Sequence, residues 1–234
     1  AVALATLVGV WVAGTVTVPN ADAFLPAPTA VAASVLATPD LFLDASVGSL
    51  QKLAAGWALG ATVGGLVGAI VAFAPRTRPI AGPFLVGARV TPTIVAAPLL
   101  LVWLGISFTA ATVLIGLATF FPIAVATASG LTTLPESHRS LLDSVDAPRR
   151  ARLAVRLRYG LPTIVAGVKL SLVSGLSGVV IAEWFVANGG LGVLVNQGMR
   201  NLQPTLTYAA IACLFVLGMA LFGGTTLLQR RLDW

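Results

Sequence analysis

Long uncharged apolar stretches alternate with short polar segments along this chain. Residues 53–75, 90–135 and 201–229 carry no charged side chain. A helix that crosses a bilayer needs about 20 apolar residues, so the first and third stretches each hold one such helix and the second holds more than one. The strands of a membrane barrel would instead appear as alternating segments of about 10 residues. The pattern predicts an all-α membrane protein.

Six membrane-spanning helices within one transmembrane domain, residues 1–234, account for this pattern. The predicted spans are 1–18, 49–74, 83–104, 109–131, 161–183 and 204–228. The proline-rich segment 19–46 is expected outside the cytoplasm, with a short interfacial helix near 29–37. Residues 132–160 form a large loop between the fourth and fifth spans, and residues 184–203 form a second loop, rich in glycine and asparagine.

The first apolar segment has a second interpretation. Ala21-Asp22-Ala23 has the small-residue pattern of a signal-peptidase site. No separate polar region precedes that site, so a first transmembrane helix over 1–18 is favoured. Because the chain begins at Ala1 rather than at Met, we expect a further segment before it.

Charge is scarce, and its distribution predicts the sidedness of the chain. Only 9% of the residues are charged against 57% hydrophobic, with a net charge of +6. One side of the predicted topology collects Arg76, Arg78, Arg139, Arg149, Arg150, Arg152, Arg156, Arg158, Arg230 and Arg231. The other side has only Lys52 and Arg200. Cytoplasmic loops accumulate Lys and Arg, so the first side and both termini are expected in the cytoplasm. The positive charge therefore reports topology rather than a nucleic-acid partner.

Four glycines recur at every fourth position of the second predicted span: Gly56, Gly60, Gly64 and Gly68. Small residues at this spacing let helix backbones approach closely in lipid. The pattern predicts a helix-packing face, whose partner helix belongs either to this chain or to another copy.

The sequence pattern of the loop 132–160 predicts two short helices joined by a break. Thr133 and Glu136 form a capping-box pattern for a helix over 134–145, and Asp146 is a candidate N-cap for a second helix. In that second helix Arg149, Arg152 and Arg156 share one face. A loop that lies against anionic lipid would explain the positive charge equally well, but not the two caps.

Four segments, in order, resemble the permease subunits of ATP-binding-cassette importers. They are "LPAPTAVAASV" at 25–35, "VGARVTPTIVAAPLLLVWLGIS" at 86–107, "ATFFPIAVATASGL" at 118–131 and "LPTIVAGVKLSLVSGLSGVVIAEWFVANGGLGVLV" at 161–195. The resemblance is strongest to the nitrate, sulfonate and taurine group, and it extends from about Leu25 to Trp234. It implies the fold of a type I importer permease in the bacterial cytoplasmic membrane. It also implies a small polar or anionic solute.

The resemblance assigns the loop before the fifth span to coupling with an ATPase subunit. The residues that it implies are Glu136, Arg139, Leu142, Val145, Asp146, Arg149, Arg150, Arg152, Leu153 and Arg156. The family has a Glu-Ala-Ala stretch and, four residues later, a glycine. Counted back from Leu161-Pro162, the glutamate and glycine positions here hold Arg139 and Val145. This departure leaves open whether the chain pairs with itself or with a different permease.

The resemblance also implies partners. They are two ATP-binding-cassette ATPase subunits, a second permease, an extracytoplasmic binding protein and membrane lipid. The chain has no phosphate loop of the G-x-x-x-x-G-K-[ST] type, so ATP and Mg²⁺ are expected in the partner ATPase and no cofactor is expected in this chain. His138 and Cys213 are each the single residue of their type, and no metal site is predicted.

Polar residues inside the third and fifth spans are the candidates for the substrate pathway. They are Arg89, Thr91, Thr93, Lys169, Ser171, Ser174, Ser177 and Glu183. Charge inside a membrane indicates function, yet Arg89 and Lys169 lie near helix ends where long side chains reach the interface. The serines suit close helix packing as well as a water-lined path. Glu183, at the outer end of its span, is either a gate or binding-protein contact or an interfacial carboxylate.

Two other classes of protein compete with the importer permease. A secondary transporter or channel often shows paired broken helices or inverted repeats, and no second copy of the proline-bearing span is present. An intramembrane enzyme needs a polar catalytic set, and none of the candidate residues is paired with a base. The sequence therefore favours a permease subunit that is not itself an enzyme.

Overall fold

The computed structural model describes residues 2–17, 24–77, 79 and 93–232, and every element in these residues is helical. In chain order they are α1 (Val2–Thr17), α2 (Pro28–Ala37), α3 (Pro39–Phe73), the short 3-10 helix η2 (Pro75–Thr77), α5 (Thr93–Leu104), α6 (Phe108–Thr132), α7 (Glu136–Ser144), α8 (Arg149–Phe185), α9 (Leu191–Arg200) and α10 (Pro204–Leu232). The fold class predicted from the sequence is confirmed.

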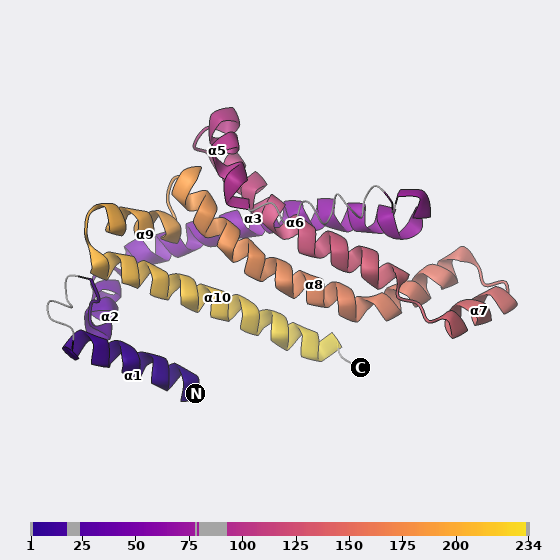
Figure 1. Ribbon diagram of the computed structural model, residues 1–234, viewed down its shortest axis with the longest axis horizontal. Helices are drawn as coiled ribbons and strands as arrows, with labels where there is room; N and C mark the ends of the chain where they lie inside the picture. The colour runs from indigo at the N-terminus through magenta and orange to yellow at the C-terminus, as the bar shows by residue number, and fades with distance from the viewer. Residues whose placement is uncertain (1, 18–23, 78, 80–92, 233–234) are drawn as a thin grey trace.

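Four of the described helices are long and apolar enough to cross a membrane: α3, α6, α8 and residues 204–227 of α10. Figure 1 shows them along the long axis of the molecule, with α9 near one end, α7 at the other and α5 projecting from the bundle. They overlap the spans predicted at 49–74, 109–131, 161–183 and 204–228. α1 has 16 residues, and α5 covers the second half of the span predicted at 83–104.

The helix α3 packs against α6 of the same chain through its four glycines. A Cβ atom on Gly60 would lie 2.0 Å from Thr119 Oγ1 and 2.6 Å from the carbonyl oxygen of Gly116. On Gly64 it would lie 2.6 Å from the carbonyl oxygen of Phe120. Only residues without a side chain permit so close an approach of two backbones, which is what holds helices together in lipid.

A close approach of two backbones at glycines also joins α6 to α8. The backbones of Gly130 and Gly160 meet so closely that a Cβ on Gly160 would lie 2.5 Å from the Gly130 carbonyl oxygen.

Two apolar clusters complete the core. One lies between α3, α5, α6 and α8 and includes Leu53, Leu100, Leu114, Ile115 and Val179. The other joins α2, α9, α10 and the start of α3 and includes Val31, Phe42, Leu191, Leu194 and Leu214.

Two helix boundaries differ from the prediction. α3 begins at Pro39, ten residues before 49, so that residues 40–46, which were predicted in the outer segment, continue into this helix. Proline suits the first turn of a helix, and Asp40 complements the positive end of its dipole. The predicted loop 184–203 contains α9, whose Leu191, Leu194 and Val195 are buried against α10. The helix expected near 29–37 is present as α2.

Both caps predicted in the loop 132–160 are wrong. α7 begins at Glu136 after Pro135, without a side-chain cap, and the Thr133 hydroxyl donates instead to the Ser129 carbonyl at the end of α6. Asp146 lies in the turn with φ of 44°, and the N-cap of α8 is Pro148. The second predicted short helix is not separate, because α8 runs without interruption from Arg149 to Phe185. Pro162 is tolerated within it, as prolines are in membrane helices.

Candidate functional site

A groove of about 640 Å³ lies between α6 and α8, with the start of α5 at its edge. Its walls are mainly small and apolar, since Ala118, Ala126, Ala166 and Gly167 leave room that larger side chains would fill. Five hydroxyl-bearing residues also line it: Thr93, Ser129, Thr163, Ser174 and Ser177. Among the described residues that line this groove, none has an ionisable side chain. It offers hydrogen bonds without a fixed charge.

The three serines predicted on α8 do not share one environment. Ser174 and Ser177 line the groove, whereas Ser171 is buried against α3. The Ser171 hydroxyl accepts a hydrogen bond from Trp57 Nε1 at 2.9 Å and donates to the Val168 carbonyl at 2.7 Å. An α-helix turns 100° per residue, so each step of three residues rotates the side chain by about 60°. Ser171 and Ser177 therefore face directions about 120° apart.

Lys169, one of the two predicted intramembrane cations, does not line the groove. Arg89 and Thr91 lie outside the described residues, while Thr93, the first residue of α5, lines the groove. Lys169 lies on another face of α8, toward α10, with its Nζ 5.0 Å from the centre of the Phe222 ring.

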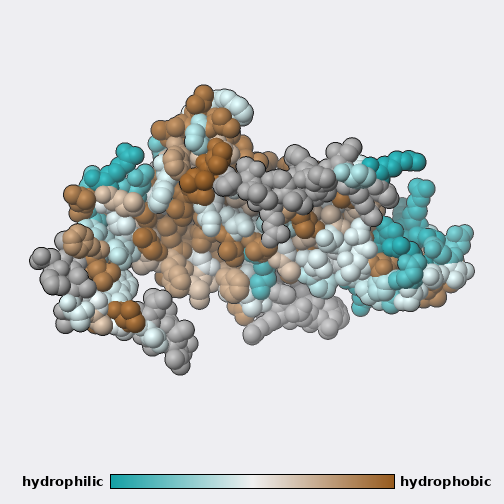
Figure 2. Space-filling view, viewed as in Figure 1, coloured by the Kyte–Doolittle hydropathy of each residue, from teal (hydrophilic) through white to brown (hydrophobic). Residues whose placement is uncertain are grey.

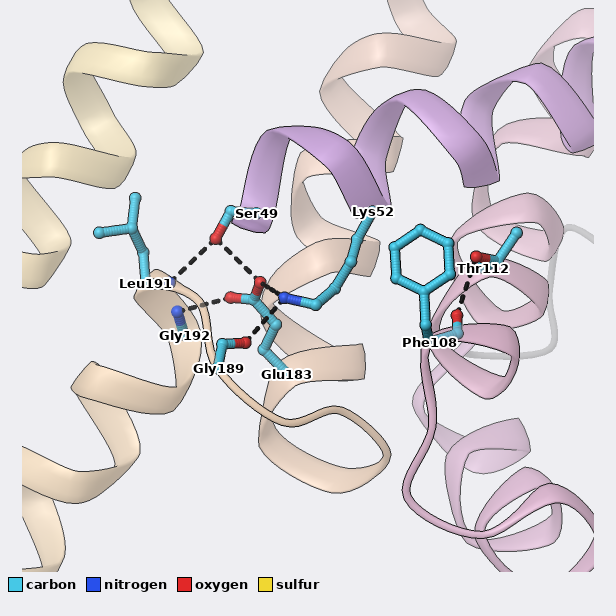
Figure 3. A network of polar contacts seen from close by, with 8 residues as sticks. All are labelled: Ser49, Lys52, Phe108, Thr112, Glu183, Gly189, Leu191 and Gly192. Atoms are coloured by element: carbon cyan, nitrogen blue, oxygen red, sulfur yellow. Dashed lines mark hydrogen bonds and ion pairs between the residues drawn. The ribbon is translucent and has the colours of Figure 1, made fainter. Parts of the chain in front are cut away.

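Glu183 lies at the end of α8 opposite α7, where Figure 3 shows it within a buried polar network. We call Ser49, Lys52, Glu183, Gly189, Leu191 and Gly192 the Glu183 cluster. Glu183 is 2% exposed and Lys52 5%, and Lys52 Nζ lies 2.8 Å from Glu183 Oε1. Glu183 is therefore not an exposed interfacial carboxylate, and it does not line the α6–α8 groove.

The hydrogen bonds of the Glu183 cluster join α3, the end of α8 and the α8–α9 turn with the start of α9. Lys52 Nζ also donates to the Gly189 carbonyl (2.7 Å), and the Ser49 hydroxyl donates to Glu183 Oε1 (2.8 Å). The Leu191 N–H donates to Ser49 Oγ (2.9 Å), and the Gly192 N–H donates to Glu183 Oε2 (2.7 Å). The carboxylate thus satisfies an N–H group in the first turn of α9, where negative charge is favourable.

The glycines of that turn are required by the geometry. Gly190 has φ of 112°, and a Cβ there would lie 1.9 Å from Glu183 Oε1. Ser49 and Lys52 were missed as functional candidates from the sequence. The signal was available, because they are three residues apart on α3 and continue the face that carries Gly56 and Gly60.

The opposite end of the bundle is hydrophilic and is formed by α7 and the first turns of α8 (Figure 2). α7 has no buried residue, and polar contacts hold it to α8. Arg152 donates to the carbonyl oxygens of Ala147 (2.8 Å) and Leu142 (3.3 Å) and pairs with Asp143. The Tyr159 hydroxyl and His138 Nε2 form a second contact between the two helices. Arg152 therefore faces α7 rather than outward.

The remaining residues predicted for coupling differ in exposure. Arg156 is half-buried, with its guanidinium 5.8 Å from the centre of the Phe73 ring at the end of α3, and Leu142 is also half-buried. The exposed ones are Glu136, Arg139, Val145, Asp146, Arg149, Arg150 and Leu153. Val145 is 65% exposed, an apolar side chain in a mostly charged surface. This set is available to a partner without rearrangement.

Long apolar helices with a charged helical loop at one end (Figure 2) fit a membrane-spanning subunit. Residues 60–234 match the family described as binding-protein-dependent transport system inner membrane component, and the chain belongs to this family. As a member it is a transporter permease rather than an enzyme, as the sequence predicted.

Individual relatives are similar over most of the chain. The taurine transport system permease protein TauC of Escherichia coli is 31% identical over 217 residues, 89% of this chain and 79% of its own. The formylaminopyrimidine transport permease protein ThiX of Halalkalibacterium halodurans is 28% identical over 211 residues, with 89% and 84% covered. A "Probable ABC transporter permease protein" of Haemophilus influenzae is 27% identical over 210 residues, with 89% and 86% covered.

These findings confirm the prediction of a permease subunit of a binding-protein-dependent importer. They support it over a secondary transporter, a channel or an intramembrane enzyme. Membership of the family implies an ATPase and a binding protein as partners.

Proposed function

We propose that this chain forms half of a substrate pathway and that the α6–α8 groove is its share of the pathway wall. The observation that carries this proposal is the lining: hydroxyl groups and small side chains, with no ionisable group among the described residues. Thr93, Ser174 and Ser177 would contact the solute, and Arg89 and Thr91 shortly precede Thr93 in the sequence. A second permease, identical or homologous, would supply the other half.

The solute of this system is a small polar or anionic molecule delivered by an extracytoplasmic binding protein. Relatives named for taurine and formylaminopyrimidine transport support this class of solute. Hydroxyl groups can donate hydrogen bonds to oxygen atoms of such a solute, and their lack of charge favours its release. Screening the cognate binding protein by thermal shift would identify the solute.

Two ATPase subunits drive the cycle, and they bind the ATP and Mg²⁺. They would contact the exposed residues of α7 and the start of α8. α8 is the element that links coupling to transport, because its 37 residues extend about 55 Å. This one helix runs from the α7 end, past the groove, to the Glu183 cluster. A movement that the ATPase imposes on the first turns of α8 would therefore reach both the groove and the Glu183 cluster.

The α7 end of the bundle and both chain termini are cytoplasmic in this proposal. The support is the concentration of arginines in the loop 132–160 and near the C-terminus, since such loops stay on the cytoplasmic side. The Glu183 cluster and α9 then lie toward the outer face, where the binding protein docks.

Reversing the two exposed arginines at the start of α8 tests the coupling surface. The double substitution Arg149→Glu, Arg150→Glu is expected to reduce co-purification of the ATPase by about tenfold or more. Two carboxylates would then repel the ATPase groups that the two arginines attract at the interface. The measurement is the amount of tagged ATPase that retains the chain. Arg200→Glu is the control, since Arg200 is exposed in α9, at the end of the bundle away from α7 (Figure 1). Equal retention by both variants would exclude docking at this surface.

Filling the groove tests the pathway. Ser177→Phe is expected to lower solute uptake about tenfold, because an aromatic ring would narrow the opening between α6 and α8. ATP hydrolysis by the assembled complex should persist. Ile211→Phe, at an exposed position of α10 that does not line the groove, is the control and should leave uptake unchanged. Normal uptake by the Ser177 variant would place the pathway elsewhere.

A further inference from the structure

Glu183 is a buried carboxylate that the proposed pathway does not use. The sequence predicted either a gate or binding-protein contact or an interfacial carboxylate. In the structure Glu183 is 2% exposed and does not line the α6–α8 groove. Its side chain therefore touches neither solute nor partner directly. Any part that it plays in transport must pass through the residues that it holds.

The first turn of α9 is capped by side chains from two other helices. The N-cap residue of α9 is Gly190, which has no side chain to accept a hydrogen bond. The Leu191 N–H donates to Ser49 Oγ of α3, and the Gly192 N–H donates to Glu183 Oε2 of α8. Helices commonly satisfy these first N–H groups with the side chain of their own N-cap residue. The start of α9 is thus fixed by α3 and α8.

The chain that connects α8 to α9 is deformable by itself. Residues 186–190 form the connection, and within it Gly189 and Gly190 have φ of 77° and 112°. Glycine has the widest choice of backbone conformations, so two consecutive glycines leave the turn many alternatives. Lys52 Nζ lies 2.7 Å from the Gly189 carbonyl oxygen and 2.8 Å from Glu183 Oε1. The Glu183 cluster therefore locks a turn that its own backbone does not fix.

The helix α9 has one buried face and one exposed polar face. Leu194 and Val195 are buried in the apolar cluster with α10, whereas Gln197 and Arg200 are exposed, as is Asn201 just after the helix. The helix lies at the end of the bundle away from α7 (Figure 1). Its orientation decides where these polar side chains are presented.

We propose that Ser49, Lys52 and Glu183 are positioning residues for the binding protein, because they hold α9 in the one orientation in which its polar face receives that partner. The inference rests on the proposed function, which places α9 at the outer face. Loss of one of the three side chains gives α9 a choice of orientations. A partner that recognises one orientation then binds more weakly, in proportion to the fraction of molecules that present it.

Titration of the assembled transporter with its binding protein tests the proposal. The complex of ATPase and permease subunits is reconstituted in lipid, and ATP hydrolysis is measured against the concentration of solute-loaded binding protein. Ser49→Ala removes one hydroxyl and keeps the ion pair of Lys52 with Glu183. The half-saturating concentration should rise about five-fold, as it does when about a fifth of the molecules present α9 correctly, while the maximal rate stays within about twofold.

Ser46→Ala is a matched control on the same helix. Ser46 lies about one turn before Ser49, is half-buried, and donates its hydroxyl to the Phe42 carbonyl of α3 itself (2.6 Å). The substitution deletes the same atom without touching α9, so the half-saturating concentration should equal that of wild type. An equal rise in both variants would overturn the proposal, since a general change in α3 would then explain the effect.

Hydrogen exchange in α9 measures the lock independently of transport. In Ser49→Ala the Leu191 N–H loses its acceptor, so amides in the first turn of α9 should exchange about tenfold faster, the effect of one lost buried hydrogen bond. Unchanged exchange would show that the cluster does not hold α9, and would overturn the proposal. Faster exchange with an unchanged half-saturating concentration would also overturn it, because the cluster would then serve stability alone.

The titration also separates this inference from the proposed function. A wild-type complex whose ATP hydrolysis does not respond to the binding protein would overturn the proposed function and this inference with it. A wild-type complex that responds, together with a Ser49→Ala complex that responds at the same concentrations, would overturn this inference alone.

Discussion

Lys52→Met is expected to destabilise the protein by about 3–5 kcal/mol, the cost of leaving one partner of a buried ion pair alone. Without the ammonium group, the Glu183 carboxylate stays almost fully buried with only Ser49 and the Gly192 N–H as donors. The Gly189 carbonyl also loses its contact with Lys52. The free energy of unfolding, measured by denaturant titration in detergent, should fall accordingly.

A double substitution separates the ion pair from simple packing. Lys52→Met combined with Glu183→Gln removes both charges and keeps an acceptor for the Gly192 N–H, so it should cost less than Lys52→Met alone. Arg200→Met removes an exposed cation and should change stability by less than about 0.5 kcal/mol. Costs that simply add in the double variant would contradict a coupled pair.

Gly60→Ala is expected to cost about 1–3 kcal/mol through overpacking between α3 and α6. The added methyl group would lie 2.0 Å from Thr119 Oγ1 and 2.6 Å from the Gly116 carbonyl oxygen. Because one of these atoms is backbone, the two helices must separate. The melting temperature of the purified chain is the measurement.

The neighbouring glycine Gly65 is a matched control on the same helix. A Cβ there meets no atom within 4 Å. Gly65→Ala should therefore leave the melting temperature unchanged or raise it slightly, since alanine is the better helix former. Equal melting temperatures for the Gly60 and Gly65 variants would show that the close approach of α3 and α6 does not limit stability.

The positions of the membrane-spanning helices were predictable because each coincides with a long uncharged apolar stretch of the sequence. An uncharged stretch of more than 20 residues has few alternatives to a helix, and α6 lies within two residues of the range predicted for it. The ends were less predictable. Thr133 and Glu136 satisfied the pattern of a capping box, yet the Thr133 hydroxyl instead satisfies a carbonyl of the preceding helix. A local motif does not specify which of two adjacent helices uses its polar group.

The candidate site was predictable in composition but not in arrangement. Ser174 and Ser177 line the groove, while Ser171 and Lys169, on the same helix, face α3 and α10. Which face of α8 meets each neighbour depends on the helices packed around it. Arg152 was predicted to face a partner and instead binds α7, because the turn at 145–148 folds α7 back along α8.

The sequence by itself determined that this chain is an all-helical membrane protein of the importer-permease family, because hydropathy and ordered motifs are properties of the linear chain. Only the tertiary structure decided that Lys52 and Glu183, 131 residues apart, neutralise each other and fasten the α8–α9 turn. It also decided that the α3 glycines pack within the chain. Pairing of distant residues depends on helix rotation and depth, which packing fixes and no local pattern encodes.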